Sequence, residues 1–427
     1  MSPSLLELPT ELVEHVVRSL PAATDVSAFR LACRALRDGA SHPFRQAYFV
    51  RRTVTLQVAS LQRLFAITQH RDYGPALQDL VVRAEHFDPH HSYDVLEQHG
   101  ASDGQRRRAV SRIELFARMQ RDYKHLRHFR LGERLLLSVF RNITKLRSLT
   151  LQYAEYDDDR QKPMRFEPFL IDRDRLEVAT EAFSMVMAAV ASAPLSVDSL
   201  QLYKRHWGGA VTLHGLHLRR YAEEGLRQAL SGVQHLRLSV STRVGSFVPP
   251  RDHEVLARPA QFLGLLPNLR ELELSLWVES AGVQCLSMPE TRDVFCYISR
   301  VMLPRLVKCR LARMDFHEQD LKQFLACSRS TLRHLELTHV YIRDGSWASL
   351  LTHLAEELSL ESLHLKLVFE DVSRLRSRLR YYGYTASLEG DGVKRKIMDF
   401  AETCHVDESS ALEGDDDWLW GLWSLDL

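Results

Sequence analysis

The sequence predicts an α/β protein in which N-terminal helices precede an irregular array of strand and helix units, with parallel strands inside and helices outside. A hexapeptide with leucine at its first, fourth and sixth positions recurs through most of the 427 residues. Segments with the apolar spacing of a helix lie between its copies. The first fifty residues carry a different pattern, which is helical and does not repeat. These three observations predict the fold class.

The hexapeptide Leu-x-x-Leu-x-Leu has nine copies, in some of which Val, Phe or Cys replaces a leucine. Residues two apart in a strand point to the same face, so the fourth and sixth residues of each copy are predicted to enter the core. The residue between them is mostly polar and is predicted to face solvent. The copies occupy residues 77–82, 126–131, 146–151, 197–202, 233–238, 269–274, 306–311, 332–337 and 360–365.

Helices are predicted between several copies because apolar residues recur there at offsets of three and four, as Leu350, Leu351, Leu354 and Leu358 do. Alternating strands and helices favour a parallel sheet with helices outside. The predicted helices cover residues 176–193, 218–230, 291–303, 318–327 and 347–358.

The array resembles leucine-rich repeats, because the last copies begin 26 and 28 residues apart. Other spacings are near 36 and 50 residues, and residues 88–108 are predicted to form a loop within one of the longest. The turn position that holds Asn or Cys in regular repeats holds Glu85, Ala154, Met314 and Val340. The next apolar position is retained as Phe87, Tyr156, Phe316 and Ile342. We expect an irregular arc; an unrelated α/β fold remains the alternative.

The first helix is predicted from apolar residues that recur every four positions, at Leu8, Leu12, Val16 and Leu20. Pro9 is near its first turn, where proline is tolerated, and Glu11 is at the positive end of the helix dipole.

A second helix is predicted from Val26, Phe29, Cys33 and Leu36, capped by Thr24 or Asp25. So small a helical unit cannot bury both apolar stripes by itself. Part of this surface is expected to contact another protein.

Two segments of the first fifty residues together resemble an F-box. They are Leu8-Pro9-x-Glu11-Leu12-Val13-x-x-Val16-Val17-x-x-Leu20 and Asp25-Val26-x-x-Phe29-Arg30-Leu31-Ala32-Cys33-Arg34-x-Leu36-Arg37. The linker of residues 22–24 and the leucine at position 36 depart from the family pattern.

The resemblance implies a Skp-type adaptor as partner and, through it, cullin and RING subunits. Leu8 and Pro9 would insert into the adaptor. The apolar contact would be lined by Leu12, Val16, Leu20, Phe29 and Cys33. The alternative is that all these residues form the core of a helical cap on the array.

Composition excludes several classes of function. Lys and Arg number 56 against 55 Asp and Glu, so no net field attracts nucleic acid or an anionic membrane. Arg106, Arg107 and Arg108 are predicted to be a solvated run rather than a phosphate site. The longest apolar run, residues 182–195, is shorter than the roughly 20 residues of a bilayer span.

The six cysteines form no Cys-x-x-Cys pair and are predicted to be free buried thiols in a reducing compartment. The first residues include acids and no basic leader, so a secretory signal is not expected. We expect a cytoplasmic or nuclear protein, or one found in both compartments.

No catalytic motif is present, and neither an enzyme activity nor a cofactor is expected. His86, His90, His91 and His99 are close in sequence, but neighbouring histidines in a polar loop are interpreted as solvated. No metal site is predicted.

The C-terminal segment of residues 405–427 contains Asp415-Asp-Asp-Trp418-Leu-Trp420-Gly-Leu-Trp423, which holds half of the six tryptophans. From residue 406 onward there are seven acidic residues and no Lys or Arg. This composition is typical of a short motif that docks into a basic, apolar groove. A cap over the open end of the array explains it equally well.

Together these features predict a helical F-box (residues 1–50), a leucine-rich-repeat-like solenoid (51–404) and an acidic, tryptophan-rich tail (405–427). The predicted function is substrate recognition in an SCF-type ubiquitin ligase, with an unidentified protein as the target. The alternatives are an interaction scaffold without a role in ubiquitin transfer, and an enzyme whose site no motif reveals.

Overall fold

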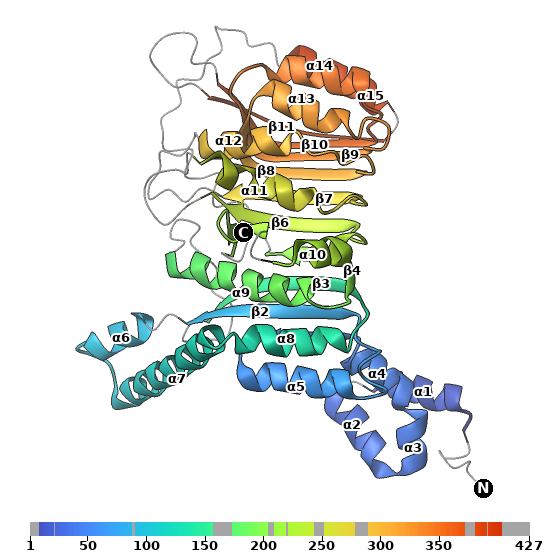
Figure 1. Cartoon of the computed structure of the whole chain (residues 1–427), viewed down its shortest axis with the longest axis vertical. Helices are drawn as coiled ribbons and strands as arrows, with labels where there is room; N and C mark the ends of the chain where they lie inside the picture. Colours follow the sequence, from blue (N-terminus) through green and yellow to red (C-terminus); the bar gives the residue numbers. More distant parts are fainter. Residues whose placement is uncertain are drawn as a thin grey trace.

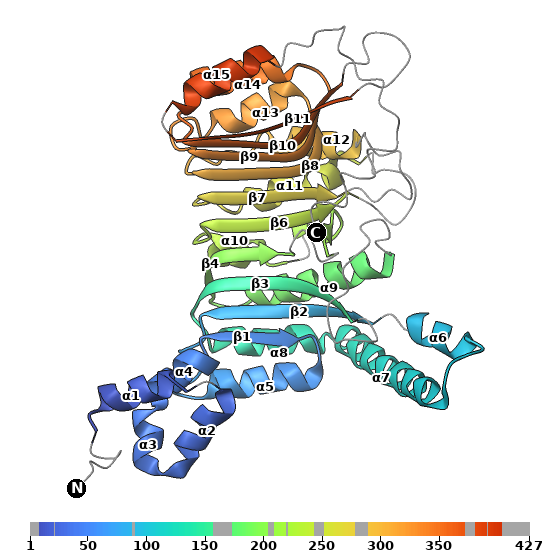
Figure 2. The ribbon, with the colours of Figure 1, turned by 180° about the vertical axis from the view of Figure 1, so that it is seen from behind.

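A computed structural model describes residues 8–20, 22–87, 90–156, 173–203, 209–218, 221–242, 252–277, 289–371, 381–390 and 392–403. Within these ranges a single long sheet carries helices on one face, while small helices stand at its N-terminal end (Figure 1). Figure 2 gives the view from behind, in which the other face of the same sheet lies in front of those helices. The protein is therefore α/β, with a helix layer on one side of the sheet.

Eleven strands form the sheet among the described residues, in the order β1-β2-β3-β4-β6-β7-β8-β9-β10-β11, with the short β5 beside β6. All pairs are parallel except β10 and β11, which are antiparallel. The strands are β1 (Arg51–Thr55), β2 (Asp79–Phe87), β3 (Lys145–Tyr156), β4 (Ser196–Leu202), β5 (Val211–Thr212), β6 (His235–Ser241), β7 (Glu271–Trp277), β8 (Lys308–Phe316), β9 (His334–Ile342), β10 (Ser362–Asp371) and β11 (Tyr381–Glu389).

Among the described residues, four helices precede the sheet and eleven follow β1, most of them as connections between neighbouring strands. The first four are α1 (Thr10–Arg18), α2 (Ala23–Ala32), α3 (Arg34–Gly39) and α4 (Ser41–Tyr48). The others are α5 (Val58–Gln69), α6 (His90–Glu97), α7 (Asp103–His128), α8 (Leu131–Arg141), α9 (Arg173–Ala191), α10 (Glu223–Leu230), α11 (His253–Leu263), α12 (Pro289–Ile298), α13 (Glu318–Ala326), α14 (Trp347–Glu357) and α15 (Val393–Thr403).

The leucines of the hexapeptide form the core, as predicted. In β9, Leu335 and Leu337 are completely buried, and their register partners on β8 are Cys309 and Leu311. The first leucine of that copy, Leu332, turns in from the preceding loop and is also completely buried. Eight of the nine copies end on a strand in this way. They join the inner faces of the helices in one continuous apolar cluster from β1 to α15.

A bulge crosses three neighbouring strands just after the hexapeptide. Arg313, His339 and Leu367 have φ values of 57°, 53° and 51°, and each is skipped in the pairing of β8, β9 and β10. An extra residue reverses the alternation of side chains. Met314 and Phe316 on β8 are therefore buried although they follow Leu311 at odd spacing. The apolar position predicted to be retained after the turn does belong to the core here.

Two predictions about the region between β2 and β3 were wrong. The copy at residues 126–131 is not a strand, since it joins the end of α7 to the start of α8. Tyr123 and Leu126 are three residues apart and continue the helical spacing of α7, which outweighs the local hexapeptide pattern. Arg130, with φ of 50°, breaks the helix between α7 and α8.

The predicted loop at residues 88–108 contains α6 and the first turns of α7. Ser102 caps α7, because its hydroxyl accepts from the backbone N–H of Gln105 while the Gln105 side chain accepts from the Ser102 N–H. This capping box starts a helix within a polar, arginine-rich segment that lacks a strong apolar period. The remaining predicted helices agree with α9, α10, α12, α13 and α14 to within a few residues.

Replacing a buried hexapeptide leucine should destabilise the sheet strongly. Leu337→Ala removes completely buried methyl groups in β9, and we expect a loss of about 2–5 kcal/mol. Urea unfolding followed by circular dichroism measures it. Met302→Ala, at a side chain that is 66% exposed, is the matched control and should change stability by less than about 0.5 kcal/mol. Equal losses in the two variants would contradict the assigned core.

Candidate functional site

Helix α1 has an inner and an outer apolar face. Val13 and Val17 are buried, whereas Leu12 is 50% exposed and Pro9 is exposed. Leu8, Val16 and Leu20 are half-buried. The helix begins at Thr10 directly after Pro9, and Glu11 is in its first turn, as predicted. The outer part of the predicted stripe therefore stays open to solvent.

The second predicted helix is interrupted. Helix α2 ends at Ala32, Cys33 is in an extended conformation, and α3 begins at Arg34. Val26 and Leu36 are buried on the two sides of the break, while Phe29 and Cys33 are half-buried. A single helix stripe through Cys33 was thus a wrong prediction. The two shorter helices can turn against α1 and α4 only because the chain bends at this residue.

Asp25 was predicted to cap the second helix from the position before it, but it lies inside the first turn of α2. Its carboxylate accepts the backbone N–H of Ala22, 3.3 Å away, from within the first turn. Leu31, later in α2, is 86% exposed.

A small core and an aromatic cluster hold these helices. Val17, Val26 and Ala40 are buried together, with Leu20, Phe29, Phe44 and Tyr48 packed around them. Toward the sheet, the ring of Phe49 stacks on Tyr73 at 4.1 Å between centroids, and Phe44 lies 5.5 Å from Phe49. The guanidinium of Arg30 lies 3.6 Å above the Phe44 ring. Aromatic contacts thus connect α4 to the segment after α5.

The sheet face that carries no helices bears rows of charged residues in register. Arg237, Glu273, Arg310 and Glu336 are successive partners on β6, β7, β8 and β9. Arg237 donates to Glu273 at 2.6 Å, and Arg310 lies 4.0 Å from Glu273 and 3.1 Å from Glu336. Glu273 and Arg310 each lie between opposite charges on the neighbouring strands, whereas Arg237 and Glu336 each have one opposite neighbour in the row. This arrangement fixes the side chains and leaves little net charge.

A second row on the same face, two residues earlier on each strand, consists of His235, Glu271, Lys308 and His334. His235 lies 3.1 Å from Glu271. Between the two rows the surface forms a shallow hollow of about 210 Å³. Its rigid, polar and alternately charged lining suits hydrogen bonding to a protein surface. The charged residues could be found in the sequence at the polar positions of the hexapeptides. Which charges lie beside each other could be known only from the pairing register of the strands.

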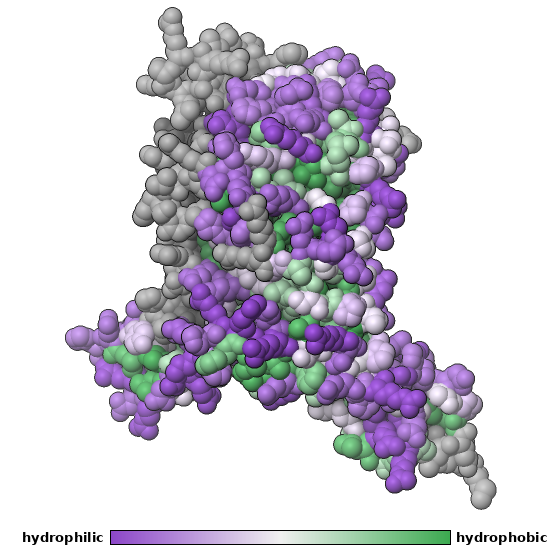
Figure 3. All heavy atoms as spheres, in the orientation of Figure 1, coloured by the Kyte–Doolittle hydropathy of each residue, from purple (hydrophilic) through white to green (hydrophobic). Residues whose placement is uncertain are grey.

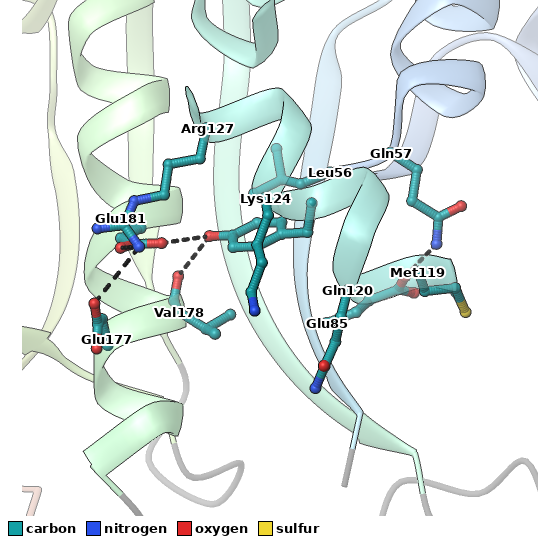
Figure 4. A pocket seen from close by; sticks show the side chains of 11 residues that line it. Leu56, Gln57, Glu85, Met119, Gln120, Lys124, Arg127, Glu177, Val178 and Glu181 are labelled. Carbon is teal, nitrogen blue, oxygen red and sulfur yellow. Dashed lines mark hydrogen bonds and ion pairs between the residues drawn. The ribbon is translucent and has the colours of Figure 1, made fainter. Parts of the chain in front are cut away.

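A larger pocket of about 370 Å³ lies where α7 crosses α9 and the ends of β1 and β2 (Figure 4). Tyr123 donates to Glu181 at 3.3 Å, and Arg127 lies 2.6 Å from Glu181 and 3.6 Å from Glu177. Burial raises the pKa of Tyr123, and the nearby Glu181 raises it further. Burial likewise raises the pKa of Glu181, although Arg127 acts to lower it. These paired groups attach α7 to α9, and we assign the pocket a structural role.

The described residues contain no cluster of three or more His, Cys, Asp or Glu side chains that could hold a metal ion. Of the four histidines singled out in the sequence, His99 is exposed, and the side chains of the other three lie outside the described residues. Free thiols are found at Cys33, Cys296, Cys309 and Cys327, but only Cys309 is buried. Burial raises the pKa of the Cys309 thiol, which keeps it protonated and unreactive.

None of the helices in the described ranges combines the length and apolar character that a bilayer crossing requires. No protein-family model matches the chain, and no curated protein matches it significantly. The tail of residues 405–427 lies outside the described residues.

The raised pKa of Glu181 predicts a pH dependence of stability. The unfolded chain releases this proton near the ordinary value of 4.5, below the pKa of the folded chain. Between the two pKa values the folded state binds more protons, so this group makes stability fall as pH rises through that range. Glu181→Gln should therefore gain stability relative to the wild type as pH rises above about 4.5.

Urea unfolding midpoints measured across that pH range test this prediction. Glu177→Gln, which removes a more exposed carboxylate beside the same arginine, is the control and should show a smaller change with pH. Parallel curves for the wild type and Glu181→Gln would contradict the assignment.

Proposed function

We propose that this chain is the substrate-recognition subunit of an SCF-type ubiquitin ligase, docking a Skp-type adaptor through its N-terminal helices. The observation that carries the proposal is the exposure of Leu12 and Leu31, at 50% and 86%, on α1 and α2. Val17 and Val26 on the same helices already form an inner core, so the outer leucines have no function in that core. Exposed leucines outside the main core favour a docking role.

The placement of the helices supports the same proposal. Helices α1–α4 stand at the N-terminal end of the sheet, clear of its open face (Figure 2). The aromatic contacts of Phe44 and Phe49 with Tyr73 join the two parts. An adaptor bound to the helices would therefore leave the open face accessible. Holding the adaptor and a target together would raise the local concentration of the target to about the millimolar range, without catalysis by this chain.

We further infer that the sheet is an irregular, leucine-rich-repeat-like solenoid. Parallel strands that bury the fourth and sixth hexapeptide residues, with helices on one side only, support this inference. Its irregularity comes from the insertion of α6 and α7, from β5, and from the antiparallel β11. The target would bind the charged rows of the open face, since a rigid scaffold positions their side chains.

One observation favours the alternative, an interaction scaffold without a role in ubiquitin transfer. The break at Cys33 departs from the single helix that the apolar spacing of Val26, Phe29, Cys33 and Leu36 predicts. A partner other than a Skp-type adaptor would then cover Leu12 and Leu31.

Co-purification tests the docking role. Leu12→Asp/Leu31→Asp places charges on two exposed positions, so the fold should survive while the adaptor and cullin are lost. A leucine that becomes buried when the adaptor binds typically contributes about 2 kcal/mol or more to binding. Adaptor binding should therefore weaken at least about tenfold. Met302→Asp, at an equally exposed apolar side chain elsewhere, should retain both proteins. A wild-type chain that captures neither protein would exclude the receptor function.

A second variant tests the open face. Arg237→Glu/Arg310→Glu places like charges beside Glu273 and Glu336, and we expect loss of target proteins with adaptor binding retained. Quantitative proteomics of the captured partners measures both. The half-lives of the lost targets, compared between wild-type and variant cells, separate the receptor from the scaffold, because only a receptor shortens them. Unchanged capture of every protein would contradict a role for this face.

A further inference from the structure

Helices α6 and α7 form an arm, residues 90–128, that projects from the side of the sheet (Figures 1 and 2). Near the C-terminal end of α7, Tyr123 and Arg127 bind α9, and Leu126 is buried in the main core. The N-terminal half of α7 packs with α6, and Ser92, Ala109 and Phe116 are buried in this part of the arm. The arm is therefore anchored at one end and open to solvent at the other.

The arm is basic in a chain that is close to neutral. The arm contains eight Lys and Arg against five Asp and Glu, and residues 103–128 alone contain eight against three, whereas the whole chain has a formal charge of +1. Arg107, Arg118 and Arg121 share one exposed face of α7, because their offsets of 11 and 14 residues are close to three and four helical turns. Within the described part of the chain, none of these three arginines has an acidic partner. Arg121 donates only to the carbonyl of Ala117 in its own helix.

This charge pattern costs stability. Arg106, Arg107 and Arg108 are in the first two turns of α7, where the helix dipole disfavours positive charge and the three repel one another. On the open face of the sheet, by contrast, arginines are arranged in ion pairs. Arg106 donates to the carbonyl of Gln98, 3.5 Å away, which does not offset its charge, so an acidic partner would relieve the repulsion.

Exposed apolar side chains accompany the arginines. Val110, 45% exposed, lies on the same face as Arg107, and Tyr93 and Leu115 are 46% and 40% exposed. Figure 3 shows a hydrophobic patch over the arm, surrounded by hydrophilic side chains. The partner of this surface should combine acids with large apolar groups.

We propose that the arm binds the chain's own tail, residues 405–427. The tail has seven acidic residues, no Lys or Arg, and Trp418, Trp420 and Trp423 within six residues. Its acids complement the arginines of α7, and its tryptophans complement the apolar patch. This proposal does not depend on the proposed ligase function.

The tail is long enough to run along the sheet from its C-terminal strands to its N-terminal strands. It leaves α15, which packs on α14 beside β10 and β11. The seven strand spacings from β10 to β2 span about 34 Å at about 4.8 Å each. The 15 residues from Cys404 to Trp418 extend to about 50 Å at about 3.4 Å each. The extended linker therefore exceeds the strand-stacking distance between β10 and β2, which is one component of the path from α15 to the arm.

Fluorescence anisotropy of a labelled peptide of residues 405–427 tests the proposal. Its main receptor is the chain without residues 405–427, which keeps every described element. We expect this chain to bind the peptide, and the full chain to bind it at least about tenfold more weakly, since its own tail is present at high effective concentration. Added salt should weaken binding, because the charges are exposed.

Two sets of variants locate the site. Arg118→Glu/Arg121→Glu should weaken peptide binding at least about tenfold, as should replacing all three peptide tryptophans with alanine. The matched control is Arg63→Glu/Arg141→Glu, which reverses two exposed arginines on α5 and α8 and should leave binding unchanged. Circular dichroism confirms that each variant is folded.

Three results would overturn the proposal. The first is no binding to the chain without its tail, and the second is binding that the arm variant and the control weaken equally. The third is equal binding by the full and shortened chains, which would show that the tail does not occupy the arm. A single-stranded RNA oligonucleotide that binds through Arg118 and Arg121 while the peptide does not would assign the arm to nucleic acid instead.

Discussion

The burial of leucines between the sheet and its single layer of helices is the interaction on which the rest of the structure depends. Each hexapeptide strand contributes two inward residues, such as Leu272 and Leu274 on β7, and the helices that cover the sheet contribute apolar faces. No strand and helix unit can bury these groups alone, so each is stable only against its neighbours. The layer also makes the two faces of the sheet different, because helices cover one face and the opposite face bears rows of charged residues.

Electrostatics differ between the two exposed surfaces that this architecture creates. On the open face of the sheet, parallel register brings Arg237, Glu273, Arg310 and Glu336 into an alternating row in which each charge has an opposite neighbour. On α7, Arg107, Arg118 and Arg121 share a helix face and have no acidic partner among the described residues. Paired charges favour a specific polar contact, whereas unpaired charges favour an acidic partner and bind it in a salt-dependent way.

The N-terminal helices show the limit of a small core. Val17, Val26 and Ala40 are enough to hold four short helices together, but not enough to cover Leu12 and Leu31. Their aromatic connection to Tyr73 makes them an attachment to the sheet rather than part of its apolar layer. A helical unit of this kind is suited to gain its missing burial from a second protein, which is why we place the proposed adaptor there.

The sequence by itself determined the strand and helix alternation, the buried leucines of eight hexapeptides and the apolar character of the first fifty residues, because these follow from local periodicity. The exposed part of the predicted docking surface, Leu12 in particular, also belonged to that pattern. Residues 126–131 fit both the hexapeptide strand pattern and the helical spacing of α7. Only the tertiary structure decided between them, in favour of the helix. It also decided the bend at Cys33, the bulge at His339 and the order of charges across strands. Those features depend on contacts between residues far apart in sequence, which no local pattern records.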